Sequence, residues 1–389
     1  MMSMQAIAID AMLPALLTIG RELRVGDPNH AQWVITAYMI GVALGQLFWG
    51  LLSDRFGRRP VLMIGMGLYV LAALLCGLTS SFTALLALRV THGLAGASVV
   101  VVRSVIRDLY SGRHMARVMS LTFIVFLIVP ILAPSLGQLI LFVAPWRYIF
   151  VVIGVFALVV WLWAMLRLPE TLHPEYRLTL APSRIAGAVK LVLSNRASLC
   201  YTLAGTVLFG ALLAYIGMVQ QIFADVFHLT TLMPAMFALC AGFMGLAAFL
   251  NSRIVERVGM RIISHSALLF FIVVAAIHVL IAALGFERLW TFVVLQSLAM
   301  GCFSLAVSNF GAMAMEPMGE IAGIGASLQG FASTLGGALV GAAIGRQFNG
   351  TTVPLAAGAL VCGVLSLGLV LMAENGRLFR PQHRDTVRA

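Results

Sequence analysis

Gly50-Leu-Leu-Ser-Asp-Arg-Phe-Gly-Arg-Arg59 is the stretch that decides the fold. It crowds charged side chains and two glycines between two long apolar runs, as a turn does when it joins two spanning helices at a membrane surface. A weaker copy, with the same order of acid, arginine, apolar residue, glycine and arginine, stands at Glu256-Arg-Val-Gly-Met-Arg261. The repeat indicates two related halves, which is the common organisation of secondary transporters.

The composition points to a membrane protein. Hydrophobic residues make up 61% of the 389 residues, and charged residues only 10%. A soluble domain carries about 25% charged residues, so a water-soluble fold is excluded. The apolar sequence falls into runs of about 20 residues, each long enough to cross about 30 Å of hydrocarbon as a helix. We predict an all-α membrane protein with twelve transmembrane helices in two pseudo-symmetric six-helix bundles. The predicted helices cover residues 1–20, 31–52, 60–79, 82–106, 115–142, 146–166, 197–224, 232–252, 262–284, 289–313, 321–345 and 353–373.

The net charge of +11 reflects membrane topology rather than nucleic-acid binding. Most arginines fall in loops on one side of the predicted bundles, and positive residues mark the cytoplasmic side. The opposite loops hold only Arg21, Arg24, Arg147, Arg288 and Arg346. We therefore expect both termini in the cytoplasm, a lipid bilayer around the helices and no nucleic-acid partner.

The polar stretches divide the chain into parts. Residues 1–167 are the expected N-terminal six-helix bundle, and residues 197–375 are the C-terminal one. Residues 168–196 form a cytoplasmic linker, with a short surface helix expected between 183 and 194, and residues 376–389 form a polar cytoplasmic tail. Because the first helix begins at the first residue, we expect either a short helix or a natural start further upstream.

Enzyme and cofactor motifs are missing from the sequence. Cys76, Cys200, Cys240, Cys302 and Cys362 stand singly in apolar helices, without metal-ligand spacing or a disulfide framework. There is no Walker phosphate loop, no H-E-x-x-H zinc motif and no nucleophile elbow. We expect no enzyme activity, no catalytic residue, no metal and no cofactor.

Asp10 is the acidic residue that we place in the middle of a spanning helix. A carboxylate there is costly unless it is protonated or paired. Arg89, inside the fourth predicted helix with His92 at i+3 on its face, is its natural partner. Opposed effects of burial and a nearby arginine could poise Asp10 to take and release a proton. For Asp10, the alternatives are a structural pair with an arginine and a shallow position near the terminus. For Arg89 the alternative is a purely structural hydrogen-bonding anchor, and for His92 it is a neutral packing or hydrogen-bonding role.

The charged turn is expected to act as a latch. Asp54 ends the second predicted helix and needs positive partners. Arg58 could pair with Asp108 at the inner end of the fourth helix. Such contacts would stabilise the outward-facing state and break when the cavity opens inward. The alternative is a solvated turn that only sets topology. The residues assigned to this latch are Gly50, Asp54, Arg55, Gly57, Arg58, Arg59 and Asp108.

Other polar residues and small-residue rows complete the candidate sites. Polar residues that either line a central cavity or bond to a neighbouring helix are Tyr38, Gln46, Gln138, Tyr215, Gln220, Gln221, Gln296 and Asn309. Glycines at four-residue spacing allow close helix packing, within one bundle or along a seam where two bundles rock. These are Gly41 and Gly45 on one helix and Gly337, Gly341 and Gly345 on another. Pro130 and Pro134, followed by Gly137, should kink the fifth helix.

These motifs resemble a known family. The turn at 50–59 resembles the signature loop of the major facilitator superfamily. Arg89-Val-Thr-His-Gly-Leu-Ala-Gly96 and Pro130-Ile-Leu-Ala-Pro-Ser-Leu-Gly137 resemble motifs of its proton-driven drug exporters. The bicyclomycin/chloramphenicol-resistance (Bcr/CflA) branch is indicated further by Asp10-Ala-Met-Leu-Pro14, Arg103-Ser-Val-Ile-Arg-Asp108, Trp146-Arg147, Leu168-Pro-Glu-Thr-Leu172 and Met315-Glu-Pro-Met-Gly319.

The resemblance implies a function. It implies that Arg89 acts in proton coupling and that Asp54 meets the N-terminal end of the eleventh helix near Gly323. It also implies a monomer in a bacterial inner membrane that exchanges protons for small amphipathic drugs by alternating access. The alternatives are efflux of an endogenous metabolite by the same fold, and a non-transporting membrane scaffold or enzyme.

Overall fold

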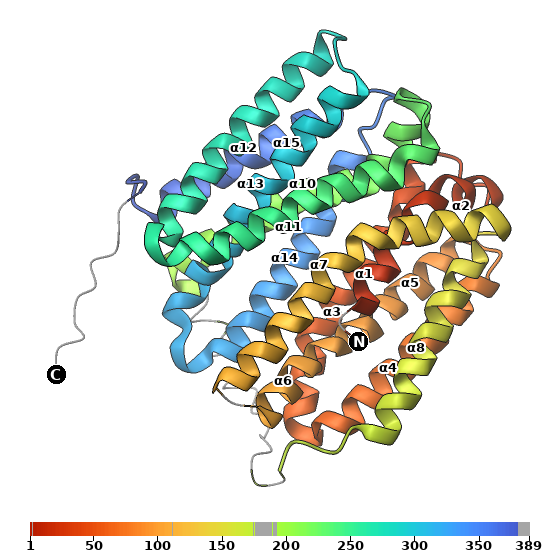
Figure 1. The fold of residues 1–389 in the computed structure, drawn as a ribbon, viewed down its shortest axis with the longest axis vertical. Helices are drawn as coiled ribbons and strands as arrows, with labels where there is room; N and C mark the ends of the chain where they lie inside the picture. The colour runs from red at the N-terminus through yellow and green to blue at the C-terminus, as the bar shows by residue number, and fades with distance from the viewer. Residues whose placement is uncertain (2, 111, 174, 176–188, 190–192, 380–389) are drawn as a thin grey trace.

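The computed structural model describes residues 1, 3–110, 112–173, 175, 189 and 193–379. The described chain is helical, and its helices form two groups that lie against each other (Figure 1). The first group contains α1 (Ser3–Asp10), η1 (Leu13–Ala15), α2 (Leu16–Glu22), η2 (Pro28–Gln32), α3 (Trp33–Phe56), α4 (Arg58–Leu78), α5 (Phe82–Gly96), η3 (Ala97–Val99), α6 (Val100–Leu109), α7 (Gly112–Val143) and α8 (Arg147–Arg167).

The second group follows the linker. It contains α10 (Arg196–Gln221), the π-helix η5 (Ile222–Val226), η6 (Thr230–Leu232), α11 (Met233–Val258), α12 (Met260–Ala283), α13 (Leu289–Met315), η7 (Glu316–Ile321), α14 (Ala322–Gly345) and α15 (Val353–Ala373). The expected surface helix between 183 and 194 and most of the 376–389 tail lie outside the described residues.

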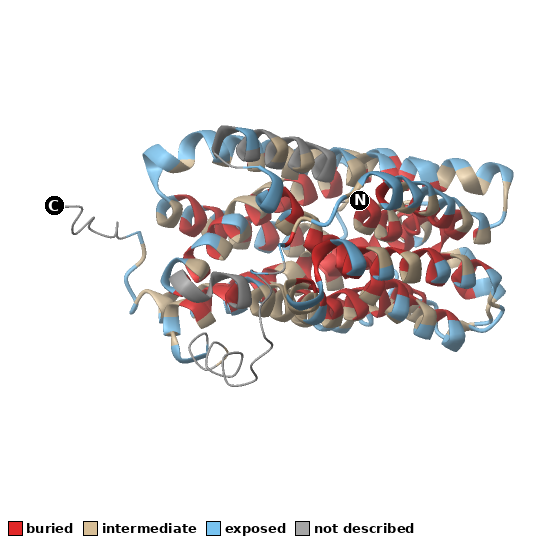
Figure 2. Cartoon of the chain, turned by 90° about the horizontal axis from the view of Figure 1, so that it is seen from below, coloured by how far each residue is buried: buried red, intermediate tan, exposed pale blue. Residues whose placement is uncertain are grey.

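The predicted all-α membrane fold is confirmed. Within the described residues, eleven helical segments are long and apolar enough to cross a membrane. The one remaining predicted span, 115–142, corresponds to α7, which runs for 32 residues through Pro130 and Pro134. Buried residues line the interior of both groups, and exposed residues face outward (Figure 2). Those outward residues include many large apolar side chains, such as Leu166 and Val143 at 83% and 84% exposed, which suits a surface facing lipid.

Two helix pairs join the groups. In Figure 1, α7 of the first group runs beside α11 of the second, and α3 packs against α14. The α3–α14 pair is antiparallel, because Gln32 at the start of α3 bonds to Gly345 at the end of α14. Farther along α3, Gln46 Nε2 donates to Thr334 Oγ1 at 3.3 Å.

The two related turns share one backbone shape. Gly57 joins α3 to α4 with φ 102° and ψ 157°, and Gly259 joins α11 to α12 with φ 92° and ψ 146°. A side chain at positive φ is strained, so both turns require glycine. This match in three dimensions supports the internal repeat inferred from the sequence.

The glycine rows pack mainly inside each group. A Cβ on Gly41 or Gly45 would overlap backbone atoms of α5, and one on Gly341 would meet Leu213 of α10. Gly337 likewise faces Phe209 of α10. Two of these five glycines also face the other group: Gly345 lies against Gln32, and Gly341 lines a small cavity between α3 and α14. The contacts of the other three favour close packing within a bundle over a seam between two bundles.

Candidate functional site

Asp10 lies where the first membrane-spanning segment is interrupted. The sequence predicted one helix over 1–20, but α1 ends at Asp10, which is only 5% exposed. Pro14 has no backbone N–H to donate to the Asp10 carbonyl, so the helix stops here. The N–H of Met12 bonds to the carbonyl of Ile9, and a short 3-10 turn leads into α2. Interrupted helices of this kind present backbone groups to the interior of transporters.

The interruption leaves the carbonyl of Ala8 without its helical N–H donor, and Arg89 donates a hydrogen bond to this carbonyl. In a continuous helix this carbonyl would accept the N–H of Met12, which here bonds elsewhere. Arg89 Nη2 donates to Ala8 O at 3.1 Å, and Arg89 Nε donates to Val34 O at 3.0 Å. The guanidinium is fully buried, so it links α5 to both α1 and α3.

His92 and two tyrosines surround this guanidinium. Arg89 Nη1 lies 3.2 Å from His92 Nδ1, and the guanidinium lies 4.3 Å from the centre of the Tyr38 ring. The His92 ring is 4.2 Å from the ring of Tyr69, whose hydroxyl donates to Met4 O at 2.9 Å. Because His92 Nδ1 faces an arginine donor, Nδ1 accepts and the ring hydrogen is on Nε2. Among the described residues, Nε2 has no hydrogen-bond partner.

The expected ion pair between Asp10 and Arg89 is not formed in this conformation. No ion pair or hydrogen bond joins Asp10 to another described residue, and the Arg89 donors go to two carbonyls and an imidazole. The two side chains are linked through the backbone of α1, in which Ala8 precedes Asp10 by two positions. The charges were visible in the sequence, whereas the free carbonyl that competes for the guanidinium was not.

Arg58 is the hub of the charged turn. Its Nε lies 3.0 Å from Asp108 Oδ2, as expected from the sequence, and its Nη1 pairs with Asp54 and donates to Ser53 Oγ at 2.9 Å. Arg58 is 3% exposed, so these partners replace its hydration. The contact expected between Asp54 and the region of Gly323 lies outside the described side chains.

Glu170 was missed by the sequence reasoning. Its carboxylate accepts the backbone N–H groups of Arg58 at 2.9 Å and Arg59 at 3.3 Å, and so caps the start of α4. Burial raises the pKa of this carboxyl, but backbone N–H groups of Leu172, Arg58, Arg59 and Thr171 outweigh burial and hold the pKa below its usual 4.5. The Leu-Pro-Glu-Thr-Leu motif was noticed, but nothing in it indicates a partner more than a hundred residues earlier.

A cavity opens beside this ionic cluster. Its volume is about 410 Å³, and both carboxylates bound by Arg58 reach it. The lining residues are Asp54, Arg58, Arg107, Asp108, Thr171, Leu172 and His173. We call this region, around the charged turn, the charged end of the molecule.

Amide side chains join the two groups at the opposite end. Gln32 Nε2 donates to Gln221 Oε1 at 2.6 Å and to Gly345 O at 3.3 Å, and Gln221 Nε2 donates to Asn29 Oδ1 at 2.9 Å. Asn29 Nδ2 donates to the carbonyls of Arg346 at 3.3 Å and Phe348 at 3.0 Å. We call Asn29, Gln32 and Gln221 the amide cluster.

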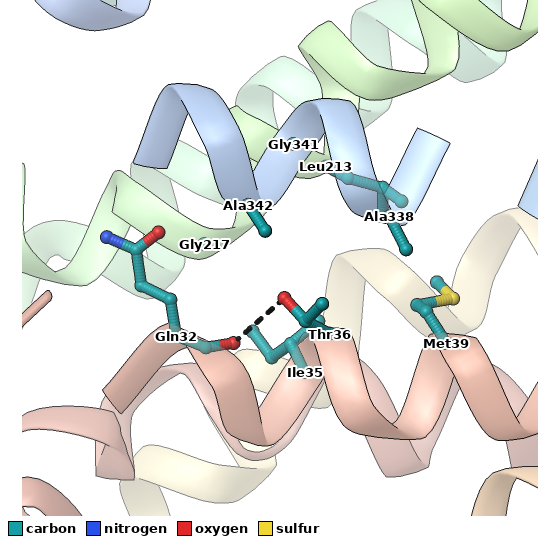
Figure 3. Close-up of a pocket in the computed structure, with 9 residues that line it drawn as sticks. All are labelled: Gln32, Ile35, Thr36, Met39, Leu213, Gly217, Ala338, Gly341 and Ala342. Atoms are coloured by element: carbon teal, nitrogen blue, oxygen red, sulfur yellow. Dashed lines mark hydrogen bonds between the residues drawn. The ribbon is translucent and has the colours of Figure 1, made fainter. Parts of the chain in front are cut away.

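Figure 3 shows the space beside the amide cluster. Gln32, Thr36 and Met39 of the first group face Ala338 and Ala342 of α14, around a cavity of about 10 Å³. That volume holds roughly one water molecule. The two groups are therefore closed against each other at this end.

The other polar candidates differ in what they contact and in how far they are buried. Asn309 bonds to Asn251 Oδ1 at 2.9 Å and to its own helix, so it is a neighbour-helix contact. Gln220 Nε2 donates to Pro14 O at 3.3 Å, beside the interruption in the first segment. Its Oε1 is buried and has no hydrogen-bond partner in the part of the chain that the structure describes. Tyr215 stacks on Phe237, Gln296 is 5% exposed on α13, and Gln138 is half-buried on α7.

Two further clusters lie in the second group. Glu374 accepts hydrogen bonds from Arg261 Nε at 2.6 Å and from the Tyr201 hydroxyl at 2.5 Å, and this fastens the end of α15 to α12. His278 Nε2 lies 2.6 Å from Glu287 Oε1, and both side chains are buried. Neither pair was foreseen, because each joins residues whose neighbourhood depends on tertiary packing.

Comparisons with known proteins agree with this architecture. The chain matches the family model described as Major Facilitator Superfamily over residues 1–341. It is 30% identical over 361 residues to the bicyclomycin resistance protein homolog of Haemophilus influenzae, covering 92% of this chain and 90% of that protein. It is 34% identical over 199 residues to multidrug resistance protein D of Escherichia coli, covering 49% of this chain and 48% of that protein. A solved D-xylose-proton symporter shares the fold, with a TM-score of 0.75 at 14% identity over 97% of this chain and 96% of that one.

Proposed function

Because the chain belongs to the major facilitator superfamily, a family of transporters rather than enzymes, we propose that it exports small amphipathic drugs across a bacterial inner membrane in exchange for protons. The names of its relatives, bicyclomycin resistance protein homolog and multidrug resistance protein D, support drugs as the cargo. The chain acts as a monomer, and the charged end, where arginines gather, faces the cytoplasm with both termini.

The observation that carries the proton part is the buried carboxylate of Asp10 at the interruption of a spanning helix. An unpaired carboxylate is costly in a membrane interior, so Asp10 is protonated in this conformation. Loss of that proton leaves a charge two residues from the carbonyl that Arg89 holds. Arg89 then moves from the Ala8 carbonyl to the Asp10 carboxylate, which shifts α5 relative to α1 and changes the contacts of the two bundles.

The energy of the gradient is adequate for this cycle. A proton delivers about 1.4 kcal/mol per pH unit, and about 2.3 kcal/mol for each charge moved across 100 mV. At the charged end, the Arg58 pairs with Asp54 and Asp108, which are formed in this conformation, break when a central cavity between the bundles opens to the cytoplasm and form again when it closes.

The first prediction tests this proposal with purified protein in liposomes. A panel that includes bicyclomycin, chloramphenicol and cellular metabolites is screened for compounds that dissipate an imposed pH gradient. We expect drugs to dissipate the gradient with the parent chain. We expect Asp10→Asn to lose this response while it still exchanges labelled drug for unlabelled drug, because Asn cannot carry a proton.

Two outcomes would contradict the proposal in different ways. Gradient dissipation by Asp10→Asn at the parental rate would remove Asp10 from the coupling. If only metabolites dissipate the gradient, the protein is still a proton antiporter, but its substrates are metabolites rather than drugs.

A further inference from the structure

The amide cluster joins segments that are distant in the sequence. Gln32 and Gln221 are 189 positions apart, and Asn29 and Phe348 are 319 positions apart. Gln32 and Gln221 are 5% and 3% exposed, so their hydrogen bonds are shielded from water. Buried amides left without partners are costly, which makes this cluster favour the closed arrangement.

The surrounding backbone is shaped to accept these side chains. A Cβ on Gly345 would overlap Gln32 Oε1, and one on Gly217 would lie 3.0 Å from it. Both glycines belong to the second bundle, whereas Gln32 belongs to the first. Directly after Gln221, the chain changes from α-helix to the π-helix η5, a feature that often marks functional positions in helices.

The two ends of the molecule differ in chemistry. At the charged end, Arg58 is held by two carboxylates of its own bundle, Asp54 and Asp108. At the opposite end, every side chain that hydrogen-bonds across the bundles within the cluster is a neutral amide, and Arg346 contributes only its carbonyl. The titratable groups nearby are Asp27, which accepts the N–H of Asn29, and His30, which faces Asp27 at 3.7 Å.

We propose that Asn29, Gln32 and Gln221 form the outer gate of the transporter: an uncharged latch that closes the periplasmic side and must release before cargo leaves. This inference rests on the alternating-access function proposed above. It adds a contrast between the two ends: charged side chains gather at the cytoplasmic end, whereas the outer gate is held by neutral hydrogen bonds.

The second prediction measures opening directly, without any cargo. A reporter cysteine replaces Ala338, which is 2% exposed between α3 and α14, and its labelling by a membrane-impermeant maleimide is timed in intact cells. The chain without the reporter gives the background. In the parent, labelling is slow because the amide cluster is closed.

The test variants are Asn29→Asp and Gln221→Glu. Each variant keeps an acceptor oxygen but loses the amide N–H donors. Asn29→Asp loses the hydrogen bonds to the carbonyls of Arg346 and Phe348, and Gln221→Glu loses the hydrogen bond to Asn29. Losing these donors should speed labelling about tenfold. Asn349→Asp is the matched control, because Asn349 bonds only within its own loop, to Thr351.

The pH dependence separates a gate from general loosening. The carboxyl introduced by Asn29→Asp regains one donor when it is protonated. The labelling rate of this variant, divided by the parental rate at the same pH, should therefore fall as the pH is lowered. The division removes every effect of pH that the two chains share. Size-exclusion chromatography confirms that each variant is folded.

Unchanged labelling would contradict the proposal. If both folded variants label within twofold of the parent at every pH, the amide cluster is not the outer gate. That result leaves drug–proton exchange untouched, since the liposome assay decides it separately. Conversely, faster labelling of the variants together with no drug–proton exchange in liposomes would support the outer gate and contradict the proposed drug export.

Discussion

At the scale of single residues, the sequence identified the charged side chains but not all of the groups that they bind. Arg58, Asp54 and Asp108 could be assigned to one cluster because a turn at a membrane surface gathers opposite charges. Glu170 could not, because it binds backbone N–H groups, which every residue carries and no sequence pattern marks. Arg89 was found for its charge, but its bond to Ala8 depends on a helix interruption.

The third prediction concerns Glu170 as the cap of α4. Glu170→Ala should lower the free energy of unfolding in detergent by about 1 kcal/mol or less, the usual size of a helix cap, reduced here by solvent exposure. Thermal unfolding measures the change. Thr171→Ala is the control, because it keeps the backbone N–H that Glu170 accepts.

The same carboxylate gives this effect a pH dependence. The pKa of Glu170 is lower in the folded chain than its usual 4.5, so its stabilising charge is fully present above that pH. The charge is lost as the pH falls below 4.5 through the folded value. The stability gap between the parent and Glu170→Gln should therefore be constant from pH 6 to 8, as a rough window, and shrink below pH 4.5. A gap that stays unchanged in acid would contradict the role of the charge.

At the scale of helices, the sequence predicted which segments span the membrane but not where a spanning helix is interrupted. Runs of apolar residues predicted every spanning segment, because length and hydropathy suffice for that. The first segment was nevertheless predicted as one helix, although Pro14 was in view, and the fourth predicted helix is divided by η3 into α5 and α6. Such breaks depend on which neighbour takes the freed backbone groups, and only packing decides that.

The fourth prediction tests the close contact of α3 and α5. A Cβ on Gly93 would overlap the carbonyl oxygen of Tyr38, a backbone atom that cannot move away by a change of side-chain rotamer. Gly93→Ala should therefore destabilise the protein by about 1–3 kcal/mol or more, as overpacking does. Gly368→Ala is the matched control, since nothing lies within 4 Å of its added Cβ. Equal melting temperatures for the two variants would contradict this close packing.

At the scale of the whole molecule, the two related halves were predictable and their contacts were not. The repeated turns at Gly57 and Gly259 share a backbone shape, yet their surroundings differ. A Cβ on Gly57 would overlap the Glu170 carboxylate, whereas nothing lies within 4 Å of one on Gly259. Which end of the bundles closes, and through which side chains, depends on contacts between residues hundreds of positions apart.

The fifth prediction tests the orientation of the molecule in the membrane. A cysteine at exposed Asn349, beside the amide cluster, should react with a membrane-impermeant maleimide in intact cells. A cysteine at exposed Arg167, near the charged end, should react only after the cells are permeabilised. Since arginines mark the cytoplasmic side, the reverse pattern would contradict the proposed topology.

The five native cysteines have a practical consequence. Cys76, Cys200, Cys240, Cys302 and Cys362 are all free and at most 6% exposed. Electrophilic compounds react with accessible thiolates, so this protein offers them no easy target. Inhibitors designed to bond covalently to sulfur will therefore need another point of attachment.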